Sequence, residues 1–221
     1  MVTLTLYGVA RSRAARVMWT CLELGVPFEH VPVTQARRVA DPLAPDAPMN
    51  TRTPAFLAIN PAGQIPAVVD DGLVMTESLA ICFHLARKHG GPLAPSSLDE
   101  EALTLNWMLW AATQCEAHAV TIVLNVADAA PGNGDEAAVA AAKAALRPRM
   151  EQLDAALAAG GGHLVGGRFT IADLIVAEVM RYVQPAPDLF EGLPALGAWM
   201  AACQGRPAHR AMQGMRAAEP A

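Results

Sequence analysis

The sequence predicts an α/β domain with a small mixed sheet, followed by an all-helical domain. Strand patterns occur only before residue 76, and every apolar pattern after residue 98 has the helical period. Residues 91–98, just before the helical part, have the composition of a linker. We therefore place the first domain at residues 1–90, the linker at 91–98 and the second domain at 99–221.

The first domain begins with a strand, a crossover helix and a second strand. Residues 3–7 alternate between apolar and polar side chains, and apolar residues then recur at helical spacing from Ala14 to Leu22. Gly25 ends this helix, and residues 28–33 form the next strand. Two strands of one sheet that are joined by a crossover helix lie parallel.

A loop, a short helix, a hairpin and a longer helix complete this domain. Residues 34–53 are rich in Pro, Ala and Asp and lack a period, which indicates an irregular loop, and residues 54–59 can form a short helix. Asp71-Gly72 separates two short apolar runs and readily adopts the positive φ angles of a tight hairpin turn. A helix over residues 77–89 follows. The predicted sheet thus has four strands.

The second domain contains only helical patterns, separated by breaks rich in Pro and Gly. The predicted helices cover residues 99–128, 135–159, 171–183, 194–203 and 207–215. Thr170 and Asp173 have the spacing of a capping box, so we assign the acidic Asp173 a role in folding and not in catalysis.

Composition argues against several classes of protein. With 53% hydrophobic and 17% charged residues, the 221-residue chain can bury a large core and shows no sign of disorder. Its net charge is −5 and its basic residues are scattered, which argues against a nucleic-acid partner. The N-terminus lacks a signal-peptide pattern, and the most apolar stretch, residues 117–130, is shorter than the about 20 residues of a membrane span. We expect a cytoplasmic protein with no membrane partner.

The cysteines and histidines do not indicate a metal site. Cys21, Cys82, Cys115 and Cys203 are far apart in the sequence and match no metal-ligand spacing, so we expect buried free thiols and neither disulfides nor zinc. The six histidines are dispersed along the chain. No metal site is therefore predicted.

Residues 60–66 and 76–81 carry the most specific pattern in the chain. They are Asn-Pro-Ala-Gly-Gln-Ile-Pro and Thr-Glu-Ser-Leu-Ala-Ile, with the predicted hairpin between them. At this spacing the pattern resembles the glutathione-binding half of the cytosolic glutathione transferases, in the serine-type, bacterial branch of that family. The resemblance covers essentially the whole chain and is strongest from Thr3 to His89.

This resemblance implies a thioredoxin-like first domain and a helical-bundle second domain that supplies a pocket for an electrophile. The implied function is a glutathione transferase, which activates the thiol of glutathione for attack on a small hydrophobic electrophile. Glutathione is then a cosubstrate, and no cofactor is implied. The family also implies a homodimer in which the first domain of one subunit packs on the second domain of the other.

Glu77 and Ser78 match the family positions that hold the γ-glutamyl end of glutathione, which carries an ammonium and a carboxylate. The free N–H groups and the positive dipole end at a helix start favour an anion, so the Ser78 N–H and hydroxyl suit the carboxylate. Glu77 can then contact the ammonium. Acidic residues and Ser are also common at any helix N-terminus, but the spacing to Ile65-Pro66 favours binding.

Ile65 and Pro66 match the family's contact with the cysteinyl unit of glutathione. The resemblance implies a cis peptide bond between them, which turns the Ile65 N–H and C=O toward the ligand like an added strand. The alternative is a simple loop proline entering a strand. Gln64 matches a position that commonly contacts the glycine carboxylate, although the family often has Lys there, and Arg52 is a second candidate for that end.

Ser12 is the predicted catalytic hydroxyl, at the point where the first strand leads into the first helix and close to Arg11, Arg13 and Arg16. A free thiol has a pKa of about 8.5, and lowering it by about two units requires about 2.7 kcal/mol of differential stabilisation. A hydroxyl donor, a helix N-terminus and nearby arginines can supply that stabilisation. Ser before a helix is also an ordinary N-cap, and the two roles compete for one hydroxyl.

Tyr7 is the alternative activating group, because other branches of the family use a Tyr or a Cys for this task. Its place immediately before Gly8 matches a structural aromatic of serine-type members better. The chain has no Cys-x-x-Cys pair, which argues against thiol–disulfide exchange.

The resemblance places the electrophile pocket at the start of the helical domain, facing the first domain. Met108, Ala111, Gln114 and Cys115 are the candidates for its lining, although residues at this spacing are equally explained as core. Two other functions stay open: a glutathione-dependent isomerase of a conjugated acid, and a non-catalytic protein that binds glutathione or hydrophobic ligands.

Overall fold

The computed structural model describes residues 4–127 and 133–219, which form two compact units. Unit 1 contains the residues up to Gly91 together with those from Arg206 onward, and unit 2 runs from Pro92 to Gly205. The sequence predicts that all of residues 99–221 belong to the helical domain. The structure differs at the last helix, which belongs to unit 1 because it packs against the first helix of the chain.

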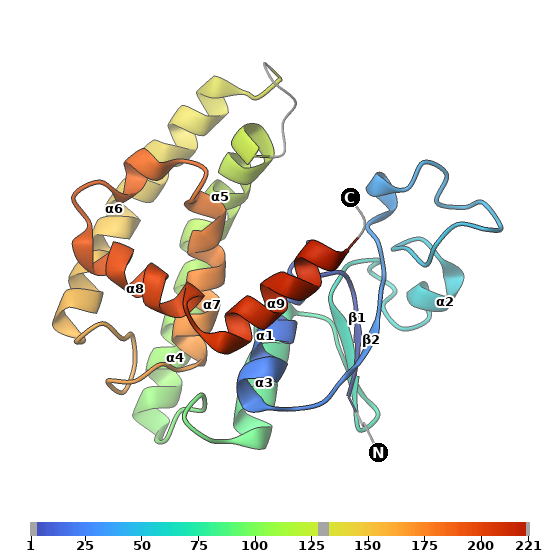
Figure 1. Ribbon diagram of the computed structural model, residues 1–221, viewed down its shortest axis with the longest axis horizontal. Helices are drawn as coiled ribbons and strands as arrows, with labels where there is room; N and C mark the ends of the chain where they lie inside the picture. Colours follow the sequence, from blue (N-terminus) through green and yellow to red (C-terminus); the bar gives the residue numbers. More distant parts are fainter. Residues whose placement is uncertain (1–3, 128–132, 220–221) are drawn as a thin grey trace. The chain divides into compact units, whose positions relative to one another are not determined.

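Unit 1 contains a four-stranded mixed sheet, as predicted (Figure 1). Its strands are β1 (Leu4–Tyr7), β2 (Glu29–Val31), β3 (Ala67–Asp70) and β4 (Leu73–Met75), in the order β2-β1-β3-β4. β1 is parallel to β2 and antiparallel to β3, and β3 and β4 form the hairpin. Asp71 and Gly72 in its turn have φ angles of 49° and 86°, as the sequence predicted.

The described residues of unit 1 form four α-helices besides the sheet. They are α1 (Ala14–Leu24), α2 (Pro54–Leu57), α3 (Ser78–His89) and α9 (Pro207–Ala218), with a 3-10 turn η1 (Ala36–Arg38). α1 contacts α3 and α9, and Figure 1 shows the three helices close together. Every residue from Ala14 to Cys21 is buried, so α1 buries its entire circumference and not only the predicted apolar face.

In the described part of unit 2, all the regular elements are helices, joined by loops. Its elements are α4 (Leu98–Trp110), η2 (Ala111–Cys115), α5 (Glu116–Ile122), η3 (Val123–Ala127), α6 (Glu136–Ala159), α7 (Ile171–Met180), η4 (Arg181–Val183), η5 (Pro187–Phe190) and α8 (Pro194–Gln204). α4, η2, α5 and η3 form one continuous helix with two π-helical segments. The sequence predicted a single helix over residues 99–128, of which Asp128 lies outside the described residues. All residues of α7 are buried, so α7 is the central helix of this unit.

The predicted capping box at the start of α7 is present. Thr170 N donates to Asp173 Oδ2 at 3.0 Å, while the Oδ1 atom accepts from Leu164 N at 3.1 Å and from Trp199 Nε1 at 2.9 Å. Burial raises the pKa of Asp173 even though these hydrogen bonds favour its ionised form. Asp173 therefore joins a helix start, a preceding loop and α8 in the interior of unit 2.

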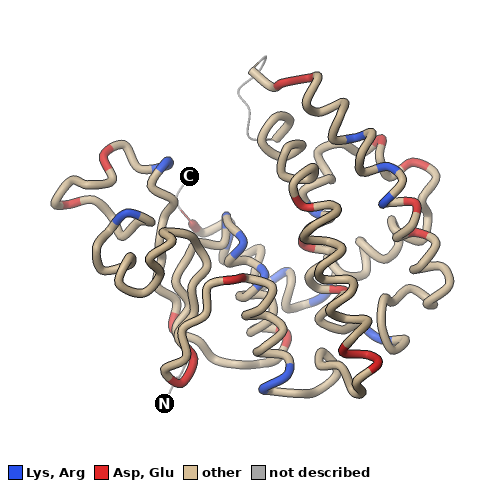
Figure 2. Tube along the Cα trace, turned by 180° about the vertical axis from the view of Figure 1, so that it is seen from behind, with Lys and Arg blue, Asp and Glu red and all other residues tan. Residues whose placement is uncertain are grey.

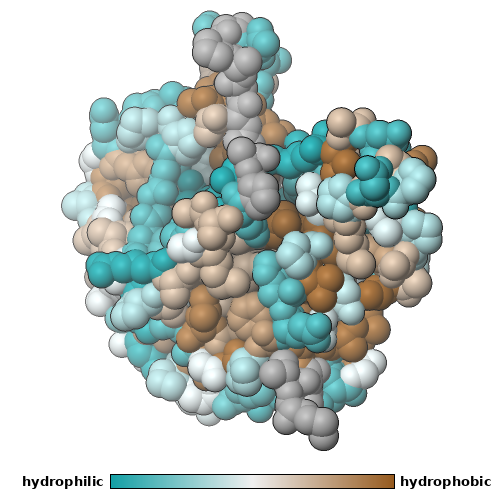
Figure 3. Space-filling view, turned by 45° about the vertical axis from the view of Figure 1, so that its right-hand side comes forward, coloured by the Kyte–Doolittle hydropathy of each residue, from teal (hydrophilic) through white to brown (hydrophobic). Residues whose placement is uncertain are grey.

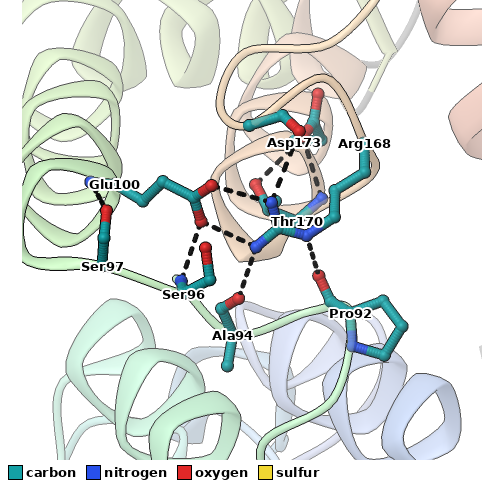
Figure 4. A network of polar contacts seen from close by, with 9 residues as sticks. Pro92, Ala94, Ser96, Ser97, Glu100, Arg168, Thr170 and Asp173 are labelled. Atoms are coloured by element: carbon teal, nitrogen blue, oxygen red, sulfur yellow. Dashed lines mark hydrogen bonds and ion pairs between the residues drawn. The ribbon is translucent and has the colours of Figure 1, made fainter.

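Arg168 ties the start of unit 2 to the loop before α7 (Figure 4). Its guanidinium donates to both carboxylate oxygens of Glu100, at 2.9 and 2.7 Å, and to the carbonyl oxygens of Pro92 and Ala94. The hydrogen bonds from Arg168 and from the Ser96 N–H lower the pKa of Glu100 to about 2. This bidentate pair fixes the segment that leads into α4.

The distribution of charges and thiols matches the sequence analysis. Figure 2 shows Lys and Arg scattered along the described chain, without a continuous stripe. All four cysteines are free and buried, as predicted, and burial raises the pKa of Cys115 to about 12.

Among the helices that the structure describes, none has the length and apolar character to cross a membrane.

A buried carboxylate connects the sheet of unit 1 to α3. Asp70, at the end of β3, is 3% exposed, and it accepts from His84 Nε2 at 2.9 Å and from Lys88 Nζ at 2.6 Å. Burial raises the pKa of Asp70, but the hydrogen bonds and charges of Lys88 and His84 outweigh that effect and lower it. Ionised Asp70 therefore stabilises the folded state.

We expect Asp70→Asn to lower the free energy of unfolding at pH 7 by about 2 kcal/mol, because the buried oxygen loses its charge-assisted hydrogen bonds. The pKa of Asp70 in the folded state lies below its value in the unfolded chain, which is about 3.9. The stabilisation from ionised Asp70 is therefore fully present at pH values above the unfolded-state pKa, and it is lost as the pH falls through the folded-state pKa. The difference between wild type and variant should thus shrink in acid, as measured by denaturant unfolding across pH. Asp71→Asn, which removes the exposed neighbouring partner of Lys88, is the matched control and should change stability by less than about 0.5 kcal/mol.

In unit 2, Asp173→Ala should destabilise the protein by about 3 kcal/mol, because it removes a cap and leaves buried N–H donors without an acceptor. Thermal unfolding followed by circular dichroism checks this. Asp135→Ala removes the exposed N-cap of α6 and should cost only about 1 kcal/mol. Equal effects of the two substitutions would show that the buried contacts of Asp173 contribute nothing beyond capping.

Candidate functional site

The end of β1 lies against the Ile65–Pro66 segment because residue 8 is a glycine. Gly8 has a φ of +148°, and a Cβ atom there would lie 2.8 Å from Ala14 Cβ and 3.5 Å from Ile65 Cβ. A side chain at this position would therefore separate the segments that it now joins. The contact brings the loop that carries Ser12 next to the predicted cysteinyl-binding residues.

Ser12 occupies the last position of a tight turn that leads into α1. The turn is closed by the bond from Ser12 N to Val9 O at 3.1 Å. The Ser12 hydroxyl donates to Val9 O at 2.6 Å and accepts from Ala14 N at 3.1 Å, and the residue is 8% exposed. In this structure the hydroxyl thus makes the local, cap-like contacts of the alternative interpretation. Because it has one proton, donation to a ligand would replace the bond to Val9.

The Ile65–Pro66 peptide bond is cis, as the sequence resemblance implied. Pro66 is buried, and the loop before it is held by Asn60, whose side chain donates to Gln64 O at 2.7 Å and accepts from Ala62 N at 3.1 Å. Asn60 is 2% exposed, so this loop is anchored in the interior while Gln64 itself is exposed.

Arg52 lies on a neighbouring loop that is built in a similar way. Its N–H donates to Asn50 Oδ1 at 2.9 Å, and the buried Asn50 side chain also donates to two carbonyl oxygens of its own loop. A Cβ atom on Gly63 would lie 2.8 Å from Thr51 O, so the two loops are in backbone contact. The exposed side chains of Arg52 and Gln64 therefore belong to adjoining loops.

Ser78 and Glu77 lie at the start of α3, which is where the sequence placed them. Ser78 is the first residue of the helix and is 5% exposed, and Glu77 is the exposed N-cap residue. The Ser78 hydroxyl accepts a hydrogen bond from Arg16 NH1 at 3.2 Å. Accepting this bond leaves the hydroxyl proton available to a ligand.

The contact between Arg16 and Ser78 was not predicted. From the sequence, Arg16 has only a general effect on the potential near Ser12, but in the structure it is 1% exposed and its guanidinium contacts Ser78 of the predicted γ-glutamyl site. An arginine within a helix whose other residues are mostly apolar is the sequence signal that could have indicated a buried partner.

Tyr7, the alternative activating residue, is half-buried and packs against the hydrophobic core of unit 1. Its ring lies 6.4 Å from that of Phe56, and it adjoins a buried cluster formed by Val33, Phe56 and Ala67. This placement corresponds to the structural aromatic that the sequence analysis considered.

The predicted electrophile-pocket residues divide into two groups. Met108, Ala111 and Cys115 are buried, with at most 3% of any of them exposed. Gln114 is exposed, and its side-chain oxygen accepts from Arg149 NH2 at 3.3 Å. Gln114 thus faces away from the three buried residues on the same helical stretch.

Sequence comparison identifies two matching family models. The glutathione S-transferase N-terminal domain matches residues 6–93, and the glutathione S-transferase C-terminal domain matches residues 111–207. Glutathione S-transferase 3 of Zea mays is 31% identical over 216 residues, which cover 94% of this chain and 92% of that protein. The match to glutathione S-transferase 3 of Schizosaccharomyces pombe is shorter, 36% identical over 107 residues that span 48% of this chain and 39% of that protein.

Structure comparison gives the same result. The theta class glutathione S-transferase of Xanthomonas axonopodis pv. citri, solved with glutathione bound, superposes with a TM-score of 0.76 at 29% identity and covers 96% of this chain and 97% of that one. Similarity over both domains, in sequence and in fold, shows that the chain belongs to the glutathione S-transferase family.

Proposed function

We propose that this protein binds glutathione across Ser12, Ile65 and Ser78, activates its thiol and transfers the sulfur to a small hydrophobic electrophile. Glutathione transferase activity follows from the family, and the proposal concerns the residues that perform it. One observation supports it above all. The contacts of Gly8 with Ile65 and of Arg16 with Ser78 connect three segments of unit 1 that are far apart in the sequence: the Ser12 loop with the start of α1, the Ile65–Pro66 segment and the start of α3.

Ser78 and Glu77 would hold the γ-glutamyl end of glutathione. The ligand carboxylate would accept from the Ser78 N–H and hydroxyl at the start of α3, where the dipole favours an anion. The buried guanidinium of Arg16 adds a positive charge behind Ser78. The exposed carboxylate of Glu77 is free to contact the ammonium.

Ile65, Gln64 and Arg52 would hold the remainder of the tripeptide. The Ile65 peptide, next to the loop that carries Ser12, would pair with the cysteinyl unit as an added strand does. Gln64 and Arg52 are exposed on adjoining loops and would contact the glycine carboxylate.

Ser12 would stabilise the thiolate. Its hydroxyl would turn from Val9 O toward the ligand sulfur, and the N-terminus of α1 would contribute its positive dipole. The observed bond to Val9 O also favours a second function, a non-catalytic protein that binds glutathione with the Ser12 hydroxyl left as a cap. The pKa of the bound glutathione thiol distinguishes the two functions.

A homodimer is part of the proposal, and exposed apolar side chains support it. Unit 1 exposes Leu73 and Val74 on β4, and unit 2 exposes Leu98, Leu103, Leu105 and Leu109 on α4. Figure 3 shows apolar side chains reaching the surface on the face that it presents. On α4, Leu105 and Leu109 lie one helical turn apart, and adjoining exposed apolar side chains are typical of association surfaces. A cytoplasmic location and the electrophile pocket around Met108 and Gln114 stay predictions.

We expect the thiol of bound glutathione to have a pKa about two units below that of a free thiol, and Ser12→Ala to restore it. At pH 7 the variant should turn over about twentyfold more slowly, because that shift changes the thiolate fraction by about this factor. Its rate should rise with pH through about 8.5, whereas the wild-type rate is level there. Ultraviolet absorbance of the thiolate measures the pKa of the bound thiol, and the conjugation rate measured across pH tests the predicted rates.

Glu77→Gln is the matched control for this experiment. It should weaken glutathione binding about tenfold through the lost charge-assisted bond, without moving the thiol pKa. A wild-type protein that binds glutathione with an unshifted thiol would contradict thiol activation and favour the non-catalytic binder. An unchanged thiol pKa in Ser12→Ala, with a shifted wild type, would assign activation to another group.

For the homodimer, sedimentation equilibrium should give twice the chain mass for the wild type. Leu109→Glu should shift the protein to the monomer, because it places a charge on the exposed apolar side of α4. Leu43→Glu changes an even more exposed leucine on a loop of unit 1 and should leave the dimer intact. A monomeric wild type would rule out the dimer.

A further inference from the structure

The end of α9 lies against the loop that carries Ser12. The carboxylate of Glu219 accepts from two consecutive backbone N–H groups, with Ala10 N on Oε1 and Arg11 N on Oε2, the latter at 3.0 Å. Glu219 is separated from these residues by more than 200 positions in the sequence. The contact lies within unit 1, on the residues immediately before Ser12.

These two N–H groups are the ones that the turn itself leaves unsatisfied. The turn from Val9 to Ser12 is closed by the bond from Ser12 N to Val9 O, so the N–H groups of its central residues, Ala10 and Arg11, point away from any acceptor within the turn. Ala10 is 0% exposed, and water is therefore a poor substitute. Glu219 supplies both acceptors.

The contact is reciprocal, since the loop also donates to the end of α9. The Arg11 guanidinium donates to Glu219 O at 3.3 Å and to Arg216 O at 3.5 Å, and Arg216 NH1 donates to Ala10 O at 3.3 Å. Backbone and side-chain groups of both segments thus take part. A movement of the loop or of the end of α9 would therefore break hydrogen bonds that each segment donates to the other.

The rest of α9 holds this contact in register. At its other end, Arg206 donates to Glu23 Oε1 at 2.7 and 2.5 Å, and the rings of His209 and Trp19 lie 4.7 Å apart. Glu23 lies in the last turn of α1, whereas Ala10 and Arg11 precede its first turn. α9 therefore runs antiparallel to α1 along its whole length.

We propose that Glu219 is a positioning residue for the thiol-activating hydroxyl, an inference that rests on the proposed function. The carboxylate fixes the turn from Val9 to Ser12, and both hydrogen bonds of the Ser12 hydroxyl are made to that turn and to the first residue of α1. Without Glu219, the buried N–H groups of the turn seek other acceptors and the hydroxyl loses its fixed direction. Glutathione binding at Ser78 and Ile65 does not depend on this contact.

The experiment is a double-mutant cycle on Ser12 and Glu219. Glu219→Ala should lower kcat about tenfold or more and leave the KM for glutathione unchanged, because a displaced hydroxyl costs rate and not affinity. The double variant should be no slower than Ser12→Ala alone, because both substitutions remove the same stabilisation of the thiolate by the Ser12 hydroxyl. Amide hydrogen exchange at Ala10 and Arg11 should become about tenfold faster in Glu219→Ala, with or without glutathione. Arg210→Ala, an exposed change on the same helix, is the control and should match the wild type in every measurement.

Each of the other outcomes overturns the proposal in a recognisable way. Additive losses in the double variant would reduce Glu219 to a general stabilising residue. A lower KM at unchanged kcat would mean that the carboxylate competes with glutathione. Unchanged exchange at Ala10 and Arg11 would show that the turn does not depend on Glu219. If Ser12→Ala alone keeps the wild-type kcat, the Ser12 assignment fails, whatever Glu219 does to the turn.

Discussion

The candidate site in unit 1 depends on the buried guanidinium of Arg16. A charged group that is 1% exposed is costly to bury unless it is hydrogen-bonded, and here it donates to the Ser78 hydroxyl. Ser12 lies in the turn that leads into α1, and Arg16 lies in the first turn of α1. The proposed thiol-activating residue and the partner of the proposed carboxylate-binding residue are therefore only four positions apart. In the proposed binding mode, the packing of α1 against α3 would set the separation between the positions of the thiol and of the γ-glutamyl carboxylate.

Much of unit 1 could be predicted because its signals are local. The pair Asp71-Gly72 has the positive φ angles that its residue types favour, and the Ile65–Pro66 bond is cis as the surrounding motif implied. The capping box of Thr170 and Asp173 in unit 2 was likewise readable from four adjacent residues. In each case the residues that determine the geometry lie within a few positions of one another.

The contacts that complete the site were not predictable from such signals. Arg16 and Ser78 are separated by 62 positions and Arg11 and Glu219 by 208, and no local period encodes which distant residues meet. The same limit explains the helix α1, whose spacing predicted one apolar face although its whole circumference is buried. Its remaining surface is covered by α9, which the sequence analysis assigned to the other domain.

The residues of α9 that contact α1 and its preceding loop share one face of the helix. His209, Met212, Arg216 and Glu219 follow each other at intervals of three or four positions, and Met212 in their middle is fully buried. An apolar centre flanked by polar contacts at both ends fixes the helix along its axis as well as against α1. Because the chain leaves unit 1 at Gly91 and returns at Arg206, this face docks only after unit 2 has been traversed. The conformation of the Ser12 loop, although it is encoded near the start of the sequence, is therefore completed by residues near its end.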